Sequence, residues 1–481
     1  MNNIEKYIDK FLISMIIITS IVFVLDAFTV DFNLNRPRQL LGVLFFIFTL
    51  FIFILAKFKF NANYKILVIS SYLSLALVMV ILESIFLYNH EKTNNELEIT
   101  MHEYLEKAKQ RAKELNIDFD ARTPFQVVKD FRKNNIEVFP GIASGGESCR
   151  DASFVIDNQP AIILSGISNK MHITRNESGK YFTYISDKYG FNNLNPDYEL
   201  PIDIMLLGDS YAEGYGVGPK DTIQSSLKEL KTNTISVGKA GNGPLLMLAS
   251  LIEYAKPLKP KNIIWLYTSY DNLSNLETEI RSPILTRYLD VENISQNLIS
   301  KQKTIDDILI KYFERALSNH SNHMLKNRQL KRNSQKLINK LRRFATFKRT
   351  TTHLLSALRG EMYIVDDSIY EAYRLILSKA HKIAKSLNSN IYFVYMPLFT
   401  EVEQKKGLNK KVIHIIEELN IPMIDVYNKG FLNHNDPLSL FPLRLGYGHY
   451  AAEGYNVIAR AIYEEIYQSS NKTWLFEKHG K

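Results

Sequence analysis

The stretch IDIMLLGDSYAEGYGV, residues 202–217, decides the fold. Apart from Asp203 it begins as an apolar run, which predicts a buried strand ending at Gly208, with a helix after the turn. Ser210 then lies at the rim of a sheet, where its hydroxyl can attack an ester carbonyl if a base is within hydrogen-bond reach. On the tripeptide Gly-Asp-Ser alone, the alternative is that Ser210 only caps the following helix.

Four further apolar stretches follow, separated by helical patterns, which predicts an α/β domain with a doubly wound, flavodoxin-like parallel sheet covered on both faces. They are NTISVG (233–238), NIIWLYT (262–268), NIYFVYMP (390–397) and IPMIDV (421–426). In such a sheet, functional residues lie at the carboxyl ends of the strands. A long interruption, about 273–363, predicts a helical insertion between the third and fourth of the five strands.

Two glycine-rich segments stand where helices are expected to begin. ISVGKAGNGPLLML (235–248) places Gly238, Gly241 and Gly243 after the second strand, where backbone N–H groups can approach the charge of a tetrahedral intermediate. LGYGHYAAEGYNVIARAI (445–462) places His449 directly before an amphipathic helix. Taken singly, the first is also compatible with a plain strand-to-helix turn, and the second with a packing histidine.

Together and in this order, these blocks resemble the SGNH (GDSL-like) hydrolase superfamily over about residues 202–467. The resemblance implies that Ser210 is the nucleophile and first oxyanion donor, that the Gly241 backbone N–H is a second donor, and that His449 is the base. It extends more loosely to bacterial membrane-anchored proteins that carry such a domain behind segments like 165–170 and 186–193 of this chain.

Two positions depart from the family pattern. The third block usually has Gly-x-Asn-Asp, whereas this chain has Ser-Tyr-Asp-Asn at 269–272. The donor position therefore holds Asp271, whose carboxylate accepts rather than donates, although Asn272 recovers the role if the loop shifts by one residue. Gly446 replaces the aspartate that in many members orients the imidazole. This leaves a Ser-His dyad, or a triad completed by Asp436 or Asp425, of which we rank Asp436 first.

Three long apolar runs, 11–30, 40–56 and 66–88, each approach the length of a membrane-spanning helix. They predict a three-span anchor over residues 1–90, uncleaved because two further spans follow the first. The distribution of flanking Lys and Arg predicts a cytoplasmic N-terminus. The protein is then a multi-pass protein of the plasma (inner) membrane in contact with the lipid bilayer, with its catalytic domain periplasmic or extracellular.

The pattern of residues 91–200 predicts a stalk helix and a small strand-rich subdomain with no obvious catalytic residues. Residues 201–481 are expected to form the hydrolase-like domain. Positive charge gathers in the predicted insertion, where it indicates either a solvated helix face or a site for anionic lipid or glycan. The cluster includes Lys331, Arg332, Arg342, Arg343, Lys348 and Arg349.

Composition narrows the function only slightly. The 481 residues carry a net charge of +9, and one cysteine, Cys149, excludes an internal disulfide. We expect a serine esterase acting on O-acyl, mainly O-acetyl, esters of envelope or exported glycans, with no metal, organic cofactor or nucleic acid. The alternatives are a glycan O-acyltransferase supplied by an acyl-donor or polysaccharide-assembly partner in the membrane, and a catalytically degenerate glycan-binding or assembly protein.

Overall fold

The computed structural model describes residues 4–14, 16–17, 37–74, 77–78, 81, 84, 101–141, 154–268, 271–318, 367–405, 407–446 and 448–468. The chain divides into two units, one comprising Met1–Ile99 and His320–Ile364, the other Thr100–Asn319 and Val365–Lys481. The predicted boundaries near residues 90 and 200 stay predictions. The basic residues between 331 and 349 lie outside the described residues.

In the first unit, helical segments at 4–14 and 62–74 accompany α2 (Pro37–Lys59). A small core forms around Leu12, Phe53 and Ala56, and the buried amine of Lys65 pairs with Asp9 at 2.7 Å. Among the described residues, no helix has both the length and the apolar character needed to cross a membrane.

The prediction of a three-span anchor, and with it the multi-pass localisation, is therefore wrong. A crossing needs about 20 consecutive apolar residues within one helix. The predicted run at 40–56 lies wholly within α2 but has only 17 residues, which is shorter than this length. The described helix over 62–74 carries the buried Lys65, and α2, whose side chains are described from Ile47 on, closes on Lys57 and Lys59.

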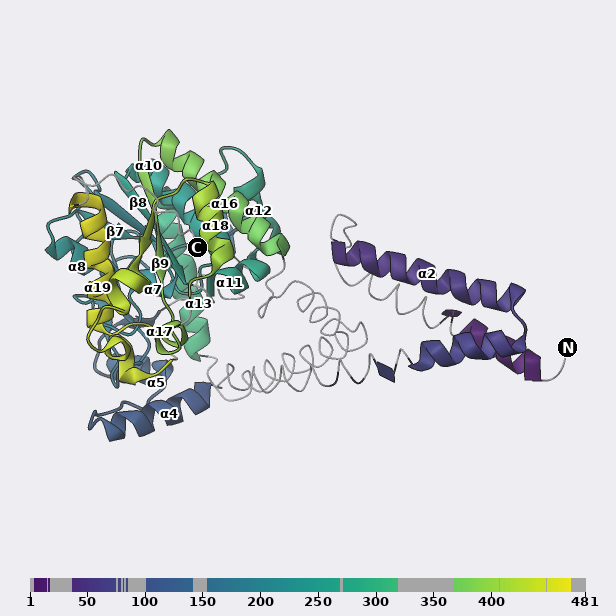
Figure 1. Ribbon diagram of the computed structural model, residues 1–481. Coiled ribbons are helices and arrows are strands. Elements are labelled where there is room, and N and C mark those ends of the chain that lie inside the picture. The colour runs from purple at the N-terminus through teal and green to yellow at the C-terminus, as the bar shows by residue number, and fades with distance from the viewer. Residues whose placement is uncertain are drawn as a thin grey trace. The chain divides into compact units, whose positions relative to one another are not determined.

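The centre of the second unit is a five-stranded sheet in which every neighbouring pair is parallel, in the order β10-β9-β8-β6-β7 (Figure 1). The strands are β6 (Ile204–Leu207), β7 (Thr234–Ser236), β8 (Asn262–Thr268), β9 (Asn390–Met396) and β10 (Met423–Asp425). The chain winds outward in one direction from β6 to β7 and in the other from β8 to β10. A crevice is therefore expected at the carboxyl ends of β6 and β8, where the direction reverses.

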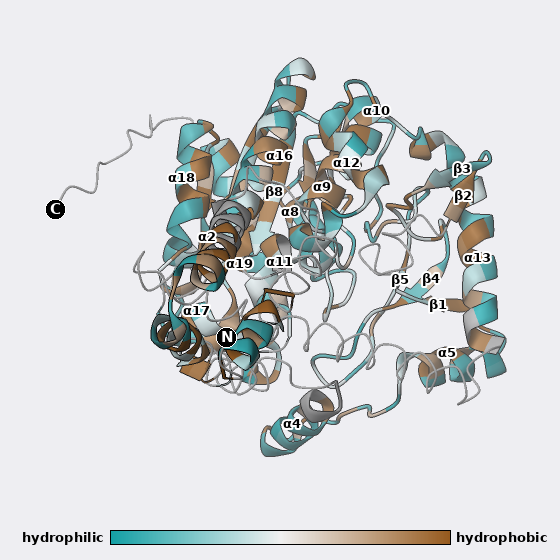
Figure 2. Ribbon diagram, turned by 90° about the vertical axis from the view of Figure 1, so that its right-hand side faces the viewer, coloured by the Kyte–Doolittle hydropathy of each residue, from teal (hydrophilic) through white to brown (hydrophobic). Residues whose placement is uncertain are grey.

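Successive side chains of the central strands enter two separate cores, as the two-residue period of a strand requires. Ile204 and Leu206 face one core, and Met205 and Leu207 face the other. The helices lie on the two faces in Figure 1, and their ribbons carry alternating polar and apolar stretches in Figure 2. On the Ile204 face lie α8 (Ile223–Glu229), η3 (Tyr427–Phe431) and α19 (Ala452–Tyr463); on the Met205 face lie α9 (Pro244–Ser250), α11 (Asp271–Glu279), α12 (Pro283–Asp290), α16 (Asp367–Ser386) and α18 (Lys410–Glu418).

Shorter helices connect these elements. They are α7 (Ser210–Glu213), η1 (Leu251–Ala255), α10 (Lys256–Leu258), α17 (Phe399–Glu403), η4 (Pro437–Leu440), η5 (Pro442–Arg444) and η6 (Glu464–Gln468). Within the predicted insertion, η2 (Leu298–Lys301) and α13 (Gln302–Ser318) follow α12, so the described part of that segment is largely helical.

A small strand region precedes the parallel sheet. Strand β4 (Met171–Ile173) pairs in parallel with β1 (Val138–Pro140) and antiparallel with β5 (Thr183–Ile185), while β2 (Phe154–Ile156) and β3 (Gln159–Ala161) form a hairpin. Helices α4 (Met101–Glu114) and α5 (Pro124–Lys133) precede it in sequence.

The small strand region is fastened to the parallel sheet by Asn193. Its amide donates to the carbonyl of Ser236 at 3.0 Å, and its side-chain oxygen accepts from the Ser236 N–H at 2.7 Å. Because Ser236 belongs to the edge strand β7, its outward N–H and carbonyl have no neighbouring strand to bind in the described sheet, and the side chain of Asn193 forms hydrogen bonds with both. Asp187 holds Asn193 in turn, at 2.7 Å.

Candidate active site

Ser210 is the first residue of α7, directly after the central strand β6. The side chain of Asp209 caps α7 by accepting from the Tyr211 N–H at 3.0 Å, and it also accepts from Thr268 at the end of β8. A Cβ at Gly208 would lie 2.8 Å from the Cβ of Ala212, so a glycine is needed for α7 to pack this closely on the strand. Ser210 therefore follows the carboxyl end of β6, next to the strand β8, and Asp209, not Ser210, is the cap.

His449 reaches Ser210 from a distant part of the chain, in the loop before α19. The distance from His449 Nε2 to Ser210 Oγ is 2.6 Å, a hydrogen bond between a base and a nucleophile. The imidazole lies between two aromatic rings, with its centroid 4.5 Å from that of Tyr211 and 5.4 Å from that of Tyr215. The side chain is only 14% exposed, so its orientation is tightly restricted.

Glu177 completes the arrangement. Its carboxylate lies 2.8 Å from His449 Nδ1 through Oε1, and its Oε2 accepts from the His449 backbone N–H at 2.7 Å. This contact places the ring proton on Nδ1 and leaves Nε2 to accept a proton from Ser210. The three side chains form a Ser-His-Glu triad in which the acid is 3% exposed.

Glu177 is not among the residues predicted from the sequence. It lies on the loop between β4 and β5 of the small strand region, more than 250 residues from His449 in sequence. The loop is fixed by Asn176, which donates to the Asp120 carbonyl at 2.7 Å and accepts from the Gly179 N–H at 2.8 Å. The only signal in the sequence is a polar stretch, RNESGK, between two apolar strands, which equally predicts an ordinary turn.

The two charged members of the triad shift each other's pKa. Burial favours a neutral carboxyl, but the charge and hydrogen bonds of His449 outweigh it, and the pKa of Glu177 is lowered. Burial likewise favours a neutral imidazole, but the charge and hydrogen bonds of Glu177 outweigh it and raise the pKa of His449 above 6.5. Nearby Arg175 acts in the opposite direction on His449. The imidazole is therefore a stronger base than an isolated one.

The glycine-rich loop after β7 lies against α7. A Cβ at Gly238 would collide with that of Ala212, and Gly241 has a φ of +78°, in the region that favours glycine. Asn242 donates to the carbonyl of Gly208 at 3.2 Å, which ties this loop to the residue two before Ser210. The loop is thus held beside the nucleophile, and the role of the Gly241 N–H as an oxyanion donor stays a proposal.

The other predicted residues are placed differently. Asp436 binds Arg444 and is not a partner of His449, and Asp425 accepts from the backbone N–H of Asn428 at 2.9 Å. Gly446 packs on Phe399, whose ring would be 2.9 Å from an added Cβ and would have to shift for a larger residue. Asp271 and Asn272 begin α11, but their side chains lie outside the described residues.

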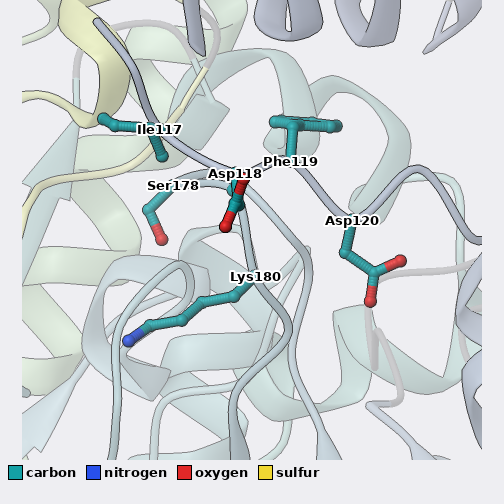
Figure 3. A pocket seen from close by; sticks show the side chains of 7 residues that line it. Ile117, Asp118, Phe119, Asp120, Ser178 and Lys180 are labelled. Carbon is teal, nitrogen blue, oxygen red and sulfur yellow. The ribbon is translucent and has the colours of Figure 1, made fainter. Parts of the chain in front are cut away.

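A cleft of about 650 Å³ opens beside the loop that carries Glu177 (Figure 3). One wall is residues 117–120, between α4 and α5, and the other is residues 178–180, directly after Glu177. Its labelled side chains include the carboxylates of Asp118 and Asp120, the amine of Lys180 and the ring of Phe119. Within the part of the chain that is described, no group of three or more His, Cys, Asp or Glu is placed to hold a metal ion.

Comparison with solved structures gives a consistent set of similar proteins. One is described as a lipolytic protein of the G-D-S-L family from Desulfitobacterium hafniense, at 9% identity and a TM-score of 0.28, covering 54% of this chain and 97% of that one. Another is a lipase/acylhydrolase from Enterococcus faecalis, at 13% identity and a TM-score of 0.29. This match covers 55% of this chain and 95% of that one. Four of these structures, including these two, are each described as a lipolytic protein, a lipase or an acylhydrolase. The resemblance predicted from the sequence is to proteins of the same kind.

An acetyl-xylooligosaccharide esterase from Geobacillus is also similar, at 13% identity and a TM-score of 0.28, covering 55% of this chain and 96% of that one. These structures are lipases and esterases, in keeping with the prediction of an ester-bond hydrolase. At such low identity and TM-score they carry no argument about this chain's substrate. No protein-family model and no curated protein matches the chain.

Proposed function

We propose that the protein is a serine esterase that removes O-acyl groups, chiefly O-acetyl, from glycans. The observation that carries the proposal is the continuous chain of contacts from Ser210 Oγ to His449 Nε2 at 2.6 Å and from His449 Nδ1 to Glu177 at 2.8 Å. Each member has the partner that the next step of acyl transfer requires.

The reaction follows from these contacts. Ser210 Oγ attacks the acyl carbonyl carbon while His449 Nε2 takes the hydroxyl proton, and Glu177 stabilises the imidazolium that forms. The backbone N–H groups of Ser210 and Gly241 hold the negative oxygen of the tetrahedral intermediate. As the intermediate collapses, His449 gives its proton to the departing sugar oxygen. Water then attacks the acyl carbon while His449 Nε2 takes one of its protons. His449 returns this proton to Ser210 Oγ as the bond between Oγ and the acyl carbon breaks, which releases the carboxylic acid and regenerates the serine.

The intact triad also argues against a degenerate, purely glycan-binding protein. Two departures motivate that alternative, Asp271 in the donor position and Gly446 in place of an acid, and Glu177 answers the second by supplying an acid to His449. A glycan O-acyltransferase uses the same acyl-enzyme with a sugar hydroxyl in place of water. No contact among the described residues favours it over hydrolysis.

Replacing the nucleophile tests the proposal. Ser210→Ala in the full chain should lower kcat for a generic acetyl ester and for an acetylated oligosaccharide by on the order of 10⁶-fold, because no acyl-enzyme can form. Release of acetate is the measurement for both substrates. The matched control is Ser439→Ala, whose hydroxyl donates to the backbone carbonyl of Asp436 and not to a member of the triad. Equal acetate release by wild type and Ser210→Ala would refute the esterase.

A further inference from the structure

A second buried pair of charges lies behind the triad. The carboxylate of Glu213 and the amine of Lys239 form an ion pair whose side chains are 2% and 1% exposed. Glu213 is the last residue of α7, three residues after Ser210, and Lys239 lies two residues before Gly241. The pair therefore joins the segment that carries the nucleophile to the loop that carries the proposed oxyanion donor.

The carboxylate of Glu213 also binds the loop backbone directly. Its Oε2 accepts from the N–H of Ala240, the neighbour of Gly241, at 2.7 Å, and its Oε1 accepts from the hydroxyl of Tyr184 at 3.2 Å. Tyr184 belongs to β5, so the same carboxylate reaches the small strand region that supplies Glu177. One side chain thus connects three parts of the active site.

A second buried carboxylate holds the other end of the loop. Glu279, at the end of α11, accepts from the N–H groups of Gly243 and Leu245 at 2.6 and 2.8 Å. Gly241 is therefore bracketed by Glu213 on one side and Glu279 on the other. Charged acceptors make hydrogen bonds about twice as strong as neutral ones, so both anchors restrict the loop tightly.

We infer that Glu213, assisted by Lys239, is a positioning residue of the reaction that fixes the Gly238–Gly243 loop so that the Gly241 N–H meets the developing oxyanion. The inference rests on the proposed esterase. Without the pair, the loop can move relative to Ser210, and misplacement by about 1 Å costs about 10²-fold in rate. A purely structural role is the competing explanation. Removing both charges of a buried ion pair is often neutral for stability, whereas removing one is strongly destabilising, so the two explanations separate.

The experiment compares two variants of the full chain. Glu213→Gln keeps an acceptor for the Ala240 N–H but leaves the Lys239 amine buried and unpaired. Glu213→Met combined with Lys239→Met removes both charges and the acceptor, with similar side-chain volumes. The matched control is Glu253→Gln, because Glu253 is equally buried and accepts from Tyr288 at 2.7 Å and from Leu298 at 3.0 Å, away from the loop.

If Glu213 positions the loop, the variant with the lower kcat should be the one with the higher unfolding temperature. The Met pair leaves only neutral groups without their acceptor, so it should unfold at a temperature between those of the wild type and Glu213→Gln, yet lose about 10²-fold in kcat with little change in KM. Glu213→Gln should unfold at a lower temperature yet lose only about tenfold in kcat, since a neutral acceptor remains. Glu253→Gln should lose stability and keep its kcat.

A Met pair with wild-type kcat would overturn the inference, as would kcat values that follow the order of stability. Should the Met pair fail to fold, Glu213→Gln decides alone: a kcat equal to that of Glu253→Gln overturns the inference. Failure of the esterase is recognised separately, because then Ser210→Ala retains the acetate release of the wild type.

Discussion

The parallel sheet and the small strand region contribute to one active site in different ways. The parallel sheet supplies Ser210 from the end of its first strand and His449 from the loop before its last long helix, as its topology leads one to expect. The small strand region supplies Glu177 from a loop with no regular place in that topology. The difference teaches that the domain of the parallel sheet supplies the general base His449, whereas a residue outside that sheet, Glu177, orients it.

The sharpest way to break this comparison is to remove the charge that the small strand region contributes. Glu177→Gln should lower kcat by roughly 10⁴-fold, because the amide no longer stabilises the imidazolium and can fix the wrong tautomer of His449. The carboxylate raises the pKa of His449, so its loss should also move the acid limb of the kcat/KM profile to lower pH. A pH profile of acetate release measures both effects.

Asp436→Asn is the matched control for Glu177→Gln, since it removes a carboxylate that binds Arg444 rather than His449. Its kcat and its acid limb should equal those of the wild type. If Asp436→Asn lost as much activity as Glu177→Gln, the small strand region would have no special part in catalysis.

The same division explains what could be predicted from the sequence. Ser210, Gly241 and His449 stand in local patterns, a strand that breaks into a turn or a glycine-rich turn before a helix, and such patterns are visible within a dozen residues. Glu177 meets His449 only because Asn176 and Asn193 fix separate loops, and no local pattern encodes that long-range packing. Asp436, which we ranked first to complete the triad, is instead bound by Arg444.

The parallel sheet was predictable because its strands are apolar on both faces. The prediction of a three-span anchor was wrong, although it also came from apolar runs. Apolar residues such as Phe53 and Ala56 also form the small core with Leu12. A run of apolar residues alone does not distinguish a membrane span from a helix that packs in a protein core. In the same way, the glycine at 446 appeared to remove the acid from the site. The acid of the triad comes instead from Glu177, which is distant from His449 in sequence.

The attachment of the small strand region to the parallel sheet can be tested at Asn193. Asn193→Ala leaves the buried N–H and carbonyl of Ser236 without this partner, at a cost of roughly 1–3 kcal/mol for each unsatisfied group. Denaturant unfolding should give a lower free energy of unfolding, and kcat should fall with it because Glu177 belongs to the loosened region.

Asn428→Ala is the control for that change. The side-chain amide of Asn428 donates to the carboxylate of Asp425, but this contact is exposed, so its loss should change the free energy of unfolding by less than about 0.5 kcal/mol. A wild-type free energy of unfolding in Asn193→Ala would mean that the apolar packing between the two regions suffices without this side chain.

The smallest expected effect concerns Arg175, which shares the β4–β5 loop with Glu177 and opposes it electrostatically. Arg175 lowers the pKa of His449, so Arg175→Gln should raise that pKa and move the acid limb of kcat/KM to higher pH. The guanidinium is exposed and screened by water, so the loss of rate on the acid limb should stay below about tenfold and shrink further in high salt. Lys180→Gln, which removes a positive charge from the same loop without acting on His449, should leave the limb in place. A shift toward lower pH in Arg175→Gln would mean that Arg175 acts mainly by holding the loop, because loosening Glu177 weakens the contact that favours the imidazolium.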